Sequence, residues 1–179
     1  MMLKPDSRSS IVLNIFIMEF ISNIFMQNAI KEIMSTHLET IDVTENAQVA
    51  AKRMNDKRIS SVLVIDKDKK SEEPIGIVTE RDLVIRVCAA GRNSNEVTIR
   101  EIMSSPIATV EPQATVETAA DLMLSNKVRH LLVINEETGK PVGIIAPSDL
   151  NKYLRANIDM DEVSSRILEA IKAEELTEP

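Results

Sequence analysis

The stretch Gly76-Ile-Val-Thr-Glu-Arg-Asp-Leu83 predicts a buried strand that turns directly into a helix. Upstream, Pro74 to Val78 reads as the return strand of a hairpin, because it follows an apolar run and a charged turn. Downstream, the helix is expected from about Glu80 to Ala90, with Gly91 ending it. The same pattern returns as Gly143-Ile-Ile-Ala-Pro-Ser-Asp-Leu150, so the chain repeats itself.

The repeat extends well beyond this stretch. Ile30-Lys-Glu-Ile-Met-Ser35 recurs as Ile99-Arg-Glu-Ile-Met-Ser104, and Val62-Leu-Val-Ile-Asp66 recurs as Leu131-Leu-Val-Ile-Asn135. The turn that follows the apolar run is two residues longer in the first copy, and the two copies otherwise keep their spacing. Agreement in order, spacing and residue type indicates a duplicated segment.

Each copy predicts a β-α-β-β-α unit. In the first, a short helix at Ile30 to Met34 leads into extended Thr40 to Val43, a helix at about Ala47 to Asp56 and a strand at Ser61 to Ile65. One copy of roughly 60 residues is too small to bury its own sheet. We therefore expect an α/β (α+β) fold in which two repeats pack sheet to sheet with pseudo-two-fold symmetry.

The sequence divides into four segments. Residues 1–26 form an apolar extension expected to be helical, 27–92 the first repeat, 93–157 the second, and 158–179 an amphipathic helix and tail. Ile11 to Met26 is too short and too polar to span a bilayer comfortably, so no transmembrane span is expected.

Composition excludes several kinds of function. A net charge of -7 and 2% aromatic residues argue against a nucleic-acid partner, which usually needs a basic face and stacking platforms. One cysteine and two histidines cannot build a thiolate metal site, and a reducing, cytoplasmic location fits. Cys88 lies in an apolar helical stretch and is expected to be a buried small hydrophobe. No glycine-rich phosphate loop, Rossmann fingerprint or catalytic triad is visible, so an enzyme is not expected.

Both strand-to-helix stretches resemble the motif of the cystathionine-β-synthase (CBS) domain, and Val128-Arg-His-Leu-Leu-Val-Ile134 resembles the central strand of that family. The resemblance covers about residues 27–157 and implies a tandem pair, or Bateman module. Such pairs have two equivalent clefts where the sheets meet, often form disc-like homodimers, and often bind AMP, ADP, ATP or related adenosyl ligands. They commonly regulate a partner protein, whose identity the sequence does not give, and seldom catalyse.

In the second copy, the resemblance assigns ribose binding to Asp149 and phosphate contacts to Arg129 and His130, with Lys127 as a further donor. Asp149 has the alternative role of capping the last helix, and the basic residues that of a solvated edge. The predicted binding set of this copy is completed by the base slot and its neighbours: Ile107, Thr109, Val110, Leu131, Ala146 and Ser148.

In the first copy, the resemblance assigns ribose to Asp82, a phosphate contact to the Thr79 hydroxyl and added charge to Arg81. The lining expected around them comprises Thr40, Ile41, Ser61 and Val62. Ser60 and Ser61 stand where the second copy has Arg129 and His130, and Ala146 stands where the first copy has Thr79. The two clefts are thus chemically unequal, and we expect Asp149 with Arg129 to form the stronger one, although either cleft can draw on both copies.

These observations favour a non-catalytic sensor that binds an adenine nucleotide and relays energy status. AMP is the first candidate, with ATP or ADP as alternatives; no metal is required, although Mg²⁺ would accompany ATP. One competing hypothesis is a ligand-free structural or scaffolding dimer, which the loss of the hydroxyl at Ala146 favours. A nucleic-acid-binding protein is the weaker alternative, because the net charge opposes it.

Overall fold

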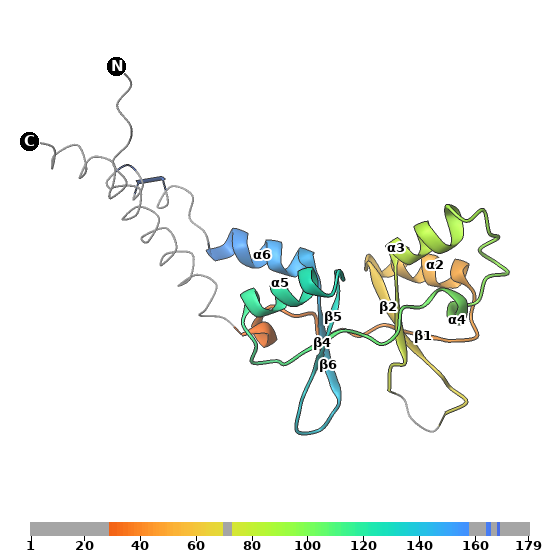
Figure 1. Ribbon diagram of the computed structural model, residues 1–179, viewed down its shortest axis with the longest axis horizontal. Helices are drawn as coiled ribbons and strands as arrows, with labels where there is room; N and C mark the ends of the chain where they lie inside the picture. The colour runs from red at the N-terminus through yellow and green to blue at the C-terminus, as the bar shows by residue number, and fades with distance from the viewer. Residues whose placement is uncertain (1–28, 70–72, 158–163, 166–167, 169–179) are drawn as a thin grey trace, which may run out of the picture.

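The computed structural model describes residues 29–69, 73–157, 164–165 and 168, and it contains two three-stranded sheets with helices on them (Figure 1). The first repeat comprises η1 (Ile30–Glu32), β1 (Thr40–Asp42), α2 (Ala47–Lys57), β2 (Ser61–Ile65), β3 (Gly76–Thr79), α3 (Glu80–Leu83) and η2 (Val84–Cys88). The second comprises α4 (Ile99–Ile102), β4 (Thr109–Val110), α5 (Val116–Ser125), β5 (Leu131–Ile134), β6 (Pro141–Ile145) and α6 (Pro147–Asn157).

Both sheets have the same topology. β1 pairs parallel with β2, and β2 pairs antiparallel with β3; β4, β5 and β6 repeat this order. The middle strand of each sheet is buried along its centre, as expected for an apolar run covered on both faces. The predicted β-α-β-β-α unit is therefore confirmed in both repeats.

The two sheets pack against each other through a shared apolar cluster. Leu63 and Ile77 of the first sheet are 2% and 7% exposed, and they meet Leu132 of the second, which is 3% exposed. Leu38, Ile107, Ile134 and Ile144 border this cluster. Burying a large aliphatic side chain contributes about 1.5–3 kcal/mol, so the interface between the sheets is a main source of stability. Sheet-to-sheet packing of the repeats is confirmed.

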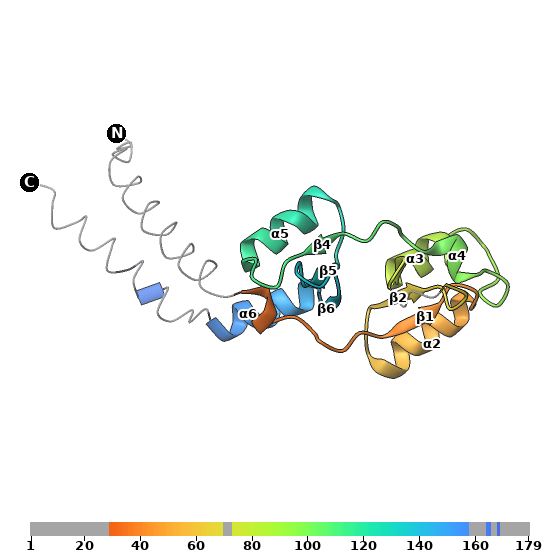
Figure 2. The same cartoon turned by 90° about the horizontal axis from the view of Figure 1, so that it is seen from below.

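The leading segments of the two repeats are exchanged. Ile30 of η1 is fully buried in the core of the second repeat, where its backbone N–H donates to the Ala114 carbonyl at 2.9 Å. Ile99 and Ile102 of α4 are fully buried in the core of the first repeat. Figures 1 and 2 show the chain crossing from η1 to β1 and crossing back from α4 to β4. Each core thus includes residues from the other repeat's leading segment.

Each crossing segment lies against a motif glycine. Ser104 N donates to the Ile77 carbonyl at 2.8 Å, and Ser35 N donates to the Ile144 carbonyl at 2.9 Å. A Cβ added to Gly76 would lie 2.8 Å from the Met103 sulfur, and one added to Gly143 would lie 2.4 Å from the Met34 sulfur. Glycine at these two positions therefore lets the crossing segments approach the strands closely.

Two details differ from the sequence-based expectation. The helix after β3 begins at Glu80 as predicted, but it widens into the π-helical η2, in which Ala89 N donates to the Val84 carbonyl at 2.8 Å. Cys88 is exposed, so the prediction that it is buried was wrong; Val87, one residue earlier, is the side chain of η2 that enters the core.

The terminal segments fall largely outside the described residues. The predicted N-terminal helix lies wholly there, and of the C-terminal one only residues 164–165 and 168 are described. Within the described ranges, no helix is long and apolar enough to cross a bilayer.

Candidate functional site

Two clefts lie between the repeats, and each joins the end of one motif to the other repeat. The Asp82 cleft is a cavity of about 300 Å³, and the larger Asp149 cleft is a cavity of about 660 Å³. The Asp82 cleft is lined by Ile77, Thr79, Arg81, Asp82, Ile85, Arg86, Ser104, Pro106, Ile107, Ala108, Lys127, Val128, Arg129 and His130. The Asp149 cleft is lined by Ser35, His37, Leu38, Glu39, Met54, Asn55, Arg58, Ile59, Ser60, Ser61, Leu63, Glu80, His130, Ile144, Ala146, Ser148, Asp149 and Lys152.

The predicted partners are grouped differently by the structure. Arg129, Lys127 and Ile107 were expected beside Asp149, but they line the cleft that contains Asp82. The exchange of leading segments explains this for Ile107, because the approach to β4 crosses onto the first repeat's motif. Lys127 and Arg129 lie between α5 and β5 and reach the Asp82 cleft from the second repeat itself. Arg129 also borders a small cavity of about 190 Å³ beside Ala146 and Ser148, so it stands near the boundary between the clefts.

Asp82 closes a reciprocal cap at the start of α3. Its Oδ2 accepts from Thr79 N at 2.9 Å and from Thr79 Oγ1 at 2.6 Å, while Thr79 Oγ1 accepts from Asp82 N at 3.3 Å. The other oxygen, Oδ1, accepts from Ser104 Oγ at 3.2 Å and lies 3.6 Å from Arg86 Nε. These contacts of Oδ1 are long, so this oxygen keeps capacity to accept from a ligand.

Asp149 makes half of the same cap at the start of α6. Its Oδ2 accepts from Ala146 N at 2.9 Å, but Ala146 has no hydroxyl to complete the box. Its Oδ1 lies 3.7 Å from the Lys152 ammonium, which is largely exposed. The capping role considered from sequence for Asp149 is thus observed, and Asp82 makes the corresponding contact as well. In each aspartate, one oxygen is engaged more weakly than the other.

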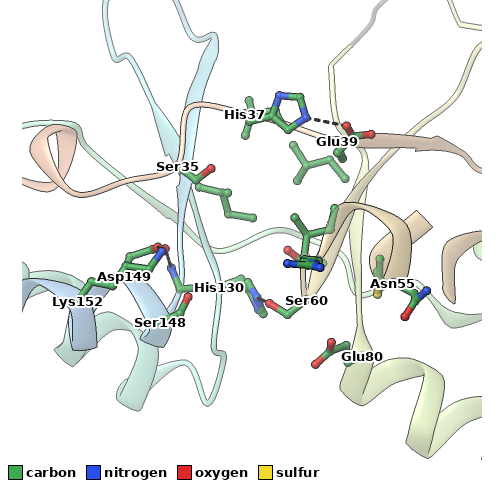
Figure 3. A pocket seen from close by; sticks show the side chains of 18 residues that line it. Ser35, His37, Glu39, Asn55, Ser60, Glu80, His130, Ser148, Asp149 and Lys152 are labelled. Atoms are coloured by element: carbon green, nitrogen blue, oxygen red, sulfur yellow. Dashed lines mark hydrogen bonds and ion pairs between the residues drawn. The ribbon is translucent and has the colours of Figure 1, made fainter. Parts of the chain in front are cut away.

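His130 lies where the two clefts meet, and it lines both of them. Ser60 Oγ and His130 Nε2 are 2.8 Å apart, a hydrogen bond that joins the two repeats (Figure 3). Nδ1 of His130 is buried and has no hydrogen-bond partner within the described part of the chain. Burial lowers the pKa of His130 to about 4; Arg129 adds to the shift, and Asp149 and Asp82 oppose it. The imidazole is therefore neutral at physiological pH.

The clefts differ in charge. Four cationic side chains line the Asp82 cleft, namely Arg81, Arg86, Lys127 and Arg129, against the single carboxylate of Asp82. Three carboxylates line the Asp149 cleft, from Glu39, Glu80 and Asp149, against the cations Arg58 and Lys152. The Asp82 cleft is therefore the better suited of the two to an anionic ligand.

Glu39 stays ionised at the mouth of the Asp149 cleft. A 2.7 Å contact joins its Oε1 to His37 Nε2, and the Lys57 ammonium is 3.5 Å away. The hydrogen bond from His37, with the charge of Lys57, holds the pKa of Glu39 below its usual value.

Several predicted lining residues are packed away from both clefts. Ile41 and Val62 lie in the core of the first repeat, and Leu131 lies in that of the second, each 1% exposed or less. Thr40 pairs with Leu63 and lines neither cleft. Thr109 and Val110 line a separate cavity of about 520 Å³ beside α5. Ser61, Ala146 and Ser148 do line the Asp149 cleft, whereas Thr79 and Arg81 line the Asp82 cleft.

The cleft residues missed from sequence include the polar side chains of Arg58, Arg86 and Ser104, and also Glu39, Glu80 and Lys152. Arg58 ends α2 in the left-handed conformation at φ 54°, and Lys127 holds the corresponding position of the second repeat at φ 55°. Because Arg58 and Lys127 occupy corresponding positions of the two repeats, the repeat alignment could have identified Arg58 once Lys127 was predicted to bind ligand. Arg86 follows Asp82 by one helical turn, which places the two side chains on one face.

No metal site is evident among the described residues, where no group of three or more His, Cys, Asp and Glu side chains is placed to hold an ion. Mg²⁺ accompanying ATP stays a prediction.

Comparison with known proteins gives a consistent picture. The family model described as the CBS domain matches residues 30–88 and again residues 99–156. An uncharacterized protein of Methanopyrus kandleri is 37% identical over 134 residues, which cover 73% of this chain and 66% of that protein.

Solved structures share the arrangement of both repeats. An uncharacterized conserved protein of Pyrococcus horikoshii matches with a TM-score of 0.67 and 25% identity, covering 75% of this chain and 98% of the other. A CBS domain protein of Pyrobaculum aerophilum, complexed with AMP, matches with a TM-score of 0.59 and 24% identity, covering 68% and 89% of the two chains. The latter likeness establishes a common fold.

Proposed function

Because this chain belongs to the CBS-domain family and carries two of these domains in tandem, we propose that it is a non-catalytic regulatory module that binds an adenine nucleotide, AMP in the first place, in the Asp82 cleft. The observation that carries the proposal is the cluster of four cations around the capped Thr79–Asp82 pair. CBS-pair proteins are often regulatory, and the protein from Pyrobaculum aerophilum with this fold holds AMP.

The Asp82 cleft offers each group that a purine ribonucleotide needs. Ile77, Ile107 and Val128 supply apolar surface for the base. Asp82 Oδ1, whose own contacts are long, would accept from the ribose hydroxyls. A hydrogen bond to a charged group contributes roughly 1.5–3 kcal/mol, so this one carboxylate would orient the sugar strongly.

The phosphate would meet the cationic rim of the same cleft. Arg81, Lys127 and Arg129 are exposed and line the cavity, so a ligand reaches them without any rearrangement of the core. Guanidinium groups bind phosphate oxygens in bidentate fashion, which adds geometric specificity to the charge attraction. Nδ1 of His130, which is buried without a partner in the described chain, gains a hydrogen bond if the ligand presents a polar atom to it.

Ligand would regulate through the packing of the two repeats. The cleft is lined by residues of both repeats, so a nucleotide that binds one arrangement of the repeats better than another shifts the population between them. The same proposal includes a homodimer in the cytoplasm. Through the change in packing, this dimer would report energy status to a regulated partner protein.

Isothermal titration of the full chain with AMP, ADP and ATP tests this proposal. AMP should bind, Asp82→Asn should weaken it by about 10- to 100-fold, and the exposed Asp121→Asn should leave it unchanged. Since Asp82 also caps α3, Arg129→Ala serves as a second variant that leaves the cap intact; it should weaken AMP by about tenfold. Absence of heat with all three nucleotides would overturn the proposal and favour a scaffolding dimer. AMP binding that depends on Asp149 alone would also overturn it.

A further inference from the structure

We propose that the Asp149 cleft takes a different ligand from the Asp82 cleft: a nucleoside that carries no phosphate, either neutral or cationic. This inference rests on the proposed function, because it assumes that the inter-repeat clefts bind nucleosides. It goes further by assigning the two clefts to ligands of opposite charge. Four differences at corresponding positions and a difference in size support it.

The Asp149 cleft lacks the groups that would hold phosphate in its counterpart. Ala146 replaces Thr79, so the hydroxyl is gone, while the backbone N–H at this position donates to the aspartate at 2.9 Å in both clefts. Pro147, the first residue of α6, has no N–H at all. The Asp82 cleft has no advantage in backbone donors at this point, because Glu80 N there donates to the Ser60 carbonyl at 3.0 Å, so the side chains make the difference.

The cations of the Asp82 cleft are also missing at two further positions. Ser148 corresponds to Arg81, and Ser60 corresponds to Arg129. Ser60 is engaged in addition, because its hydroxyl forms the 2.8 Å hydrogen bond with His130. Arg58 and Lys152 remain, but the Lys152 ammonium lies beside Asp149 and is mostly exposed.

Carboxylates occupy the Asp149 cleft instead. Glu39 stands where the other cleft has Ala108, and Glu80 enters from the start of α3 (Figure 3). The lowered pKa of Glu39 means that it keeps its negative charge at neutral pH. Like charges in a partly enclosed site repel each other, so a phosphate is disfavoured here, while a neutral or cationic group is accepted.

The cleft keeps what a nucleoside needs. Asp149 Oδ1 has only a 3.7 Å ionic contact among the described residues, and it would accept from ribose hydroxyls. Leu38, Ile59 and Ile144 offer apolar surface for a base. A cavity of about 660 Å³ is more than twice the 300 Å³ of the Asp82 cleft, and it has room for an adenosine with a substituent on its 5′ carbon.

The test is a titration of the full chain already saturated with AMP, using adenosine as the neutral probe and S-adenosylmethionine as the cationic one. At least one of them should bind at one further site, and Asp149→Asn should weaken it at least tenfold while AMP affinity changes less than threefold. If S-adenosylmethionine binds tighter than adenosine, the carboxylates select a cation; if the two bind equally, the absence of phosphate suffices.

A gain-of-function variant keeps the test decisive if Asp149→Asn is poorly folded. Ser148→Arg with Glu80→Gln restores a cation at the position that corresponds to Arg81 and removes a carboxylate, and it should raise AMP affinity at the second site at least tenfold. Binding of AMP at both wild-type clefts with equal affinity would overturn the inference, as would failure of both probes to bind. In either case AMP binding that depends on Asp82 would leave the proposed function standing, whereas loss of all AMP binding removes both.

Discussion

The Asp82 cleft and the Asp149 cleft are built from corresponding parts of the chain, but they present different chemistry. In each cleft, an aspartate caps the start of a helix of one repeat. The other repeat contributes the residues that lead into its first strand and into its middle strand. Thr79, Arg81 and Arg129 on one side become Ala146, Ser148 and Ser60 on the other. None of these side chains belongs to the apolar clusters that hold the repeats together. The packing of the repeats and the ligand chemistry of the clefts can therefore change independently of each other.

Charge reversal in the Asp82 cleft should have the largest effect. Arg81→Glu together with Arg129→Glu removes two charge-assisted contacts and adds two repulsive ones, so AMP affinity should fall by roughly a thousandfold. Both residues are exposed, and an acidic residue in the first turn of α3 suits the helix dipole, so the fold should persist. Titration calorimetry measures the loss, and circular dichroism checks the fold. An AMP affinity within tenfold of wild type would contradict the assignment of phosphate to this cleft.

The titration of His130 should have the next largest effect, and it is a property of the second repeat alone, because the counterpart Ser61 cannot titrate. The pKa of about 4 in the folded chain lies below the ordinary value of 6.5, so the unfolded state binds the proton more readily. Stability is therefore intact above pH 6.5 and falls as the pH drops towards 4, by up to about 3 kcal/mol. Denaturant unfolding between pH 7 and pH 4 measures this loss.

His130→Gln provides the control for that measurement, since an amide can still bond to Ser60 but does not titrate. Arg129, Asp149 and Asp82, the charged groups that act on His130, stay in place in this variant. The variant should show a shallower decline of stability between pH 6.5 and 4. Equal slopes for the two proteins would show that the buried imidazole does not control this window.

Substituting alanine for each of the two motif glycines should destabilise the protein by different amounts, because the crossing segments approach Gly143 more closely than Gly76. At Gly143 the new Cβ would lie 2.4 Å from the Met34 sulfur and 3.0 Å from the Ser35 carbonyl oxygen, so Gly143→Ala should cost about 2 kcal/mol. Gly76→Ala should cost less, because the nearest atom, the Met103 sulfur, would be 2.8 Å away. Urea denaturation of both variants gives the ranking. A greater loss for Gly76→Ala would refute it.

The smallest effect is expected where each aspartate meets a nearby cation. Lys152→Ala should change the free energy of unfolding by less than about 0.5 kcal/mol, since the ammonium is 81% exposed and 3.7 Å from Asp149. Arg86→Ala should cost about 1 kcal/mol, because Arg86 Nη1 also donates to the Ile102 and Met103 carbonyls at 2.6 and 2.8 Å. Thermal denaturation of the two variants compares them, and equal losses would mean that these carbonyl contacts contribute nothing.

The sequence was sufficient to predict the framework of each repeat. The apolar run Ser61 to Ile65 is the central strand, and the helix that the motif begins starts at Glu80 as expected. These elements are local: strand periodicity, capping chemistry and turn residues lie within a few positions of each other. The internal repeat strengthened the strand predictions, because each predicted strand was supported by the corresponding segment of the other repeat.

The composition of the clefts could not be predicted, because it depends on which repeat each leading segment covers. Ile30 and Ile99 are equally apolar, and burial on either repeat would satisfy them equally. Once they cross, Ile107 lines the cleft of Asp82 rather than that of Asp149. Burial on both faces of a strand also hides which side chains point to a cleft, so Ile41 and Val62 were expected in a slot and lie in the core.

The exchange of leading segments has a consequence for how such a chain can arise. A molecule with a single repeat would have a leading segment with no second core to cover, and a core without the isoleucines that complete it. Two such molecules could cover both cores by exchanging their leading segments, as in a domain-swapped dimer. The tandem chain performs this trade within itself, as though a segment-swapped dimer had been fused end to end. Both clefts lie on the seam of that fusion, so later substitutions could change each one separately while the other kept its inherited chemistry.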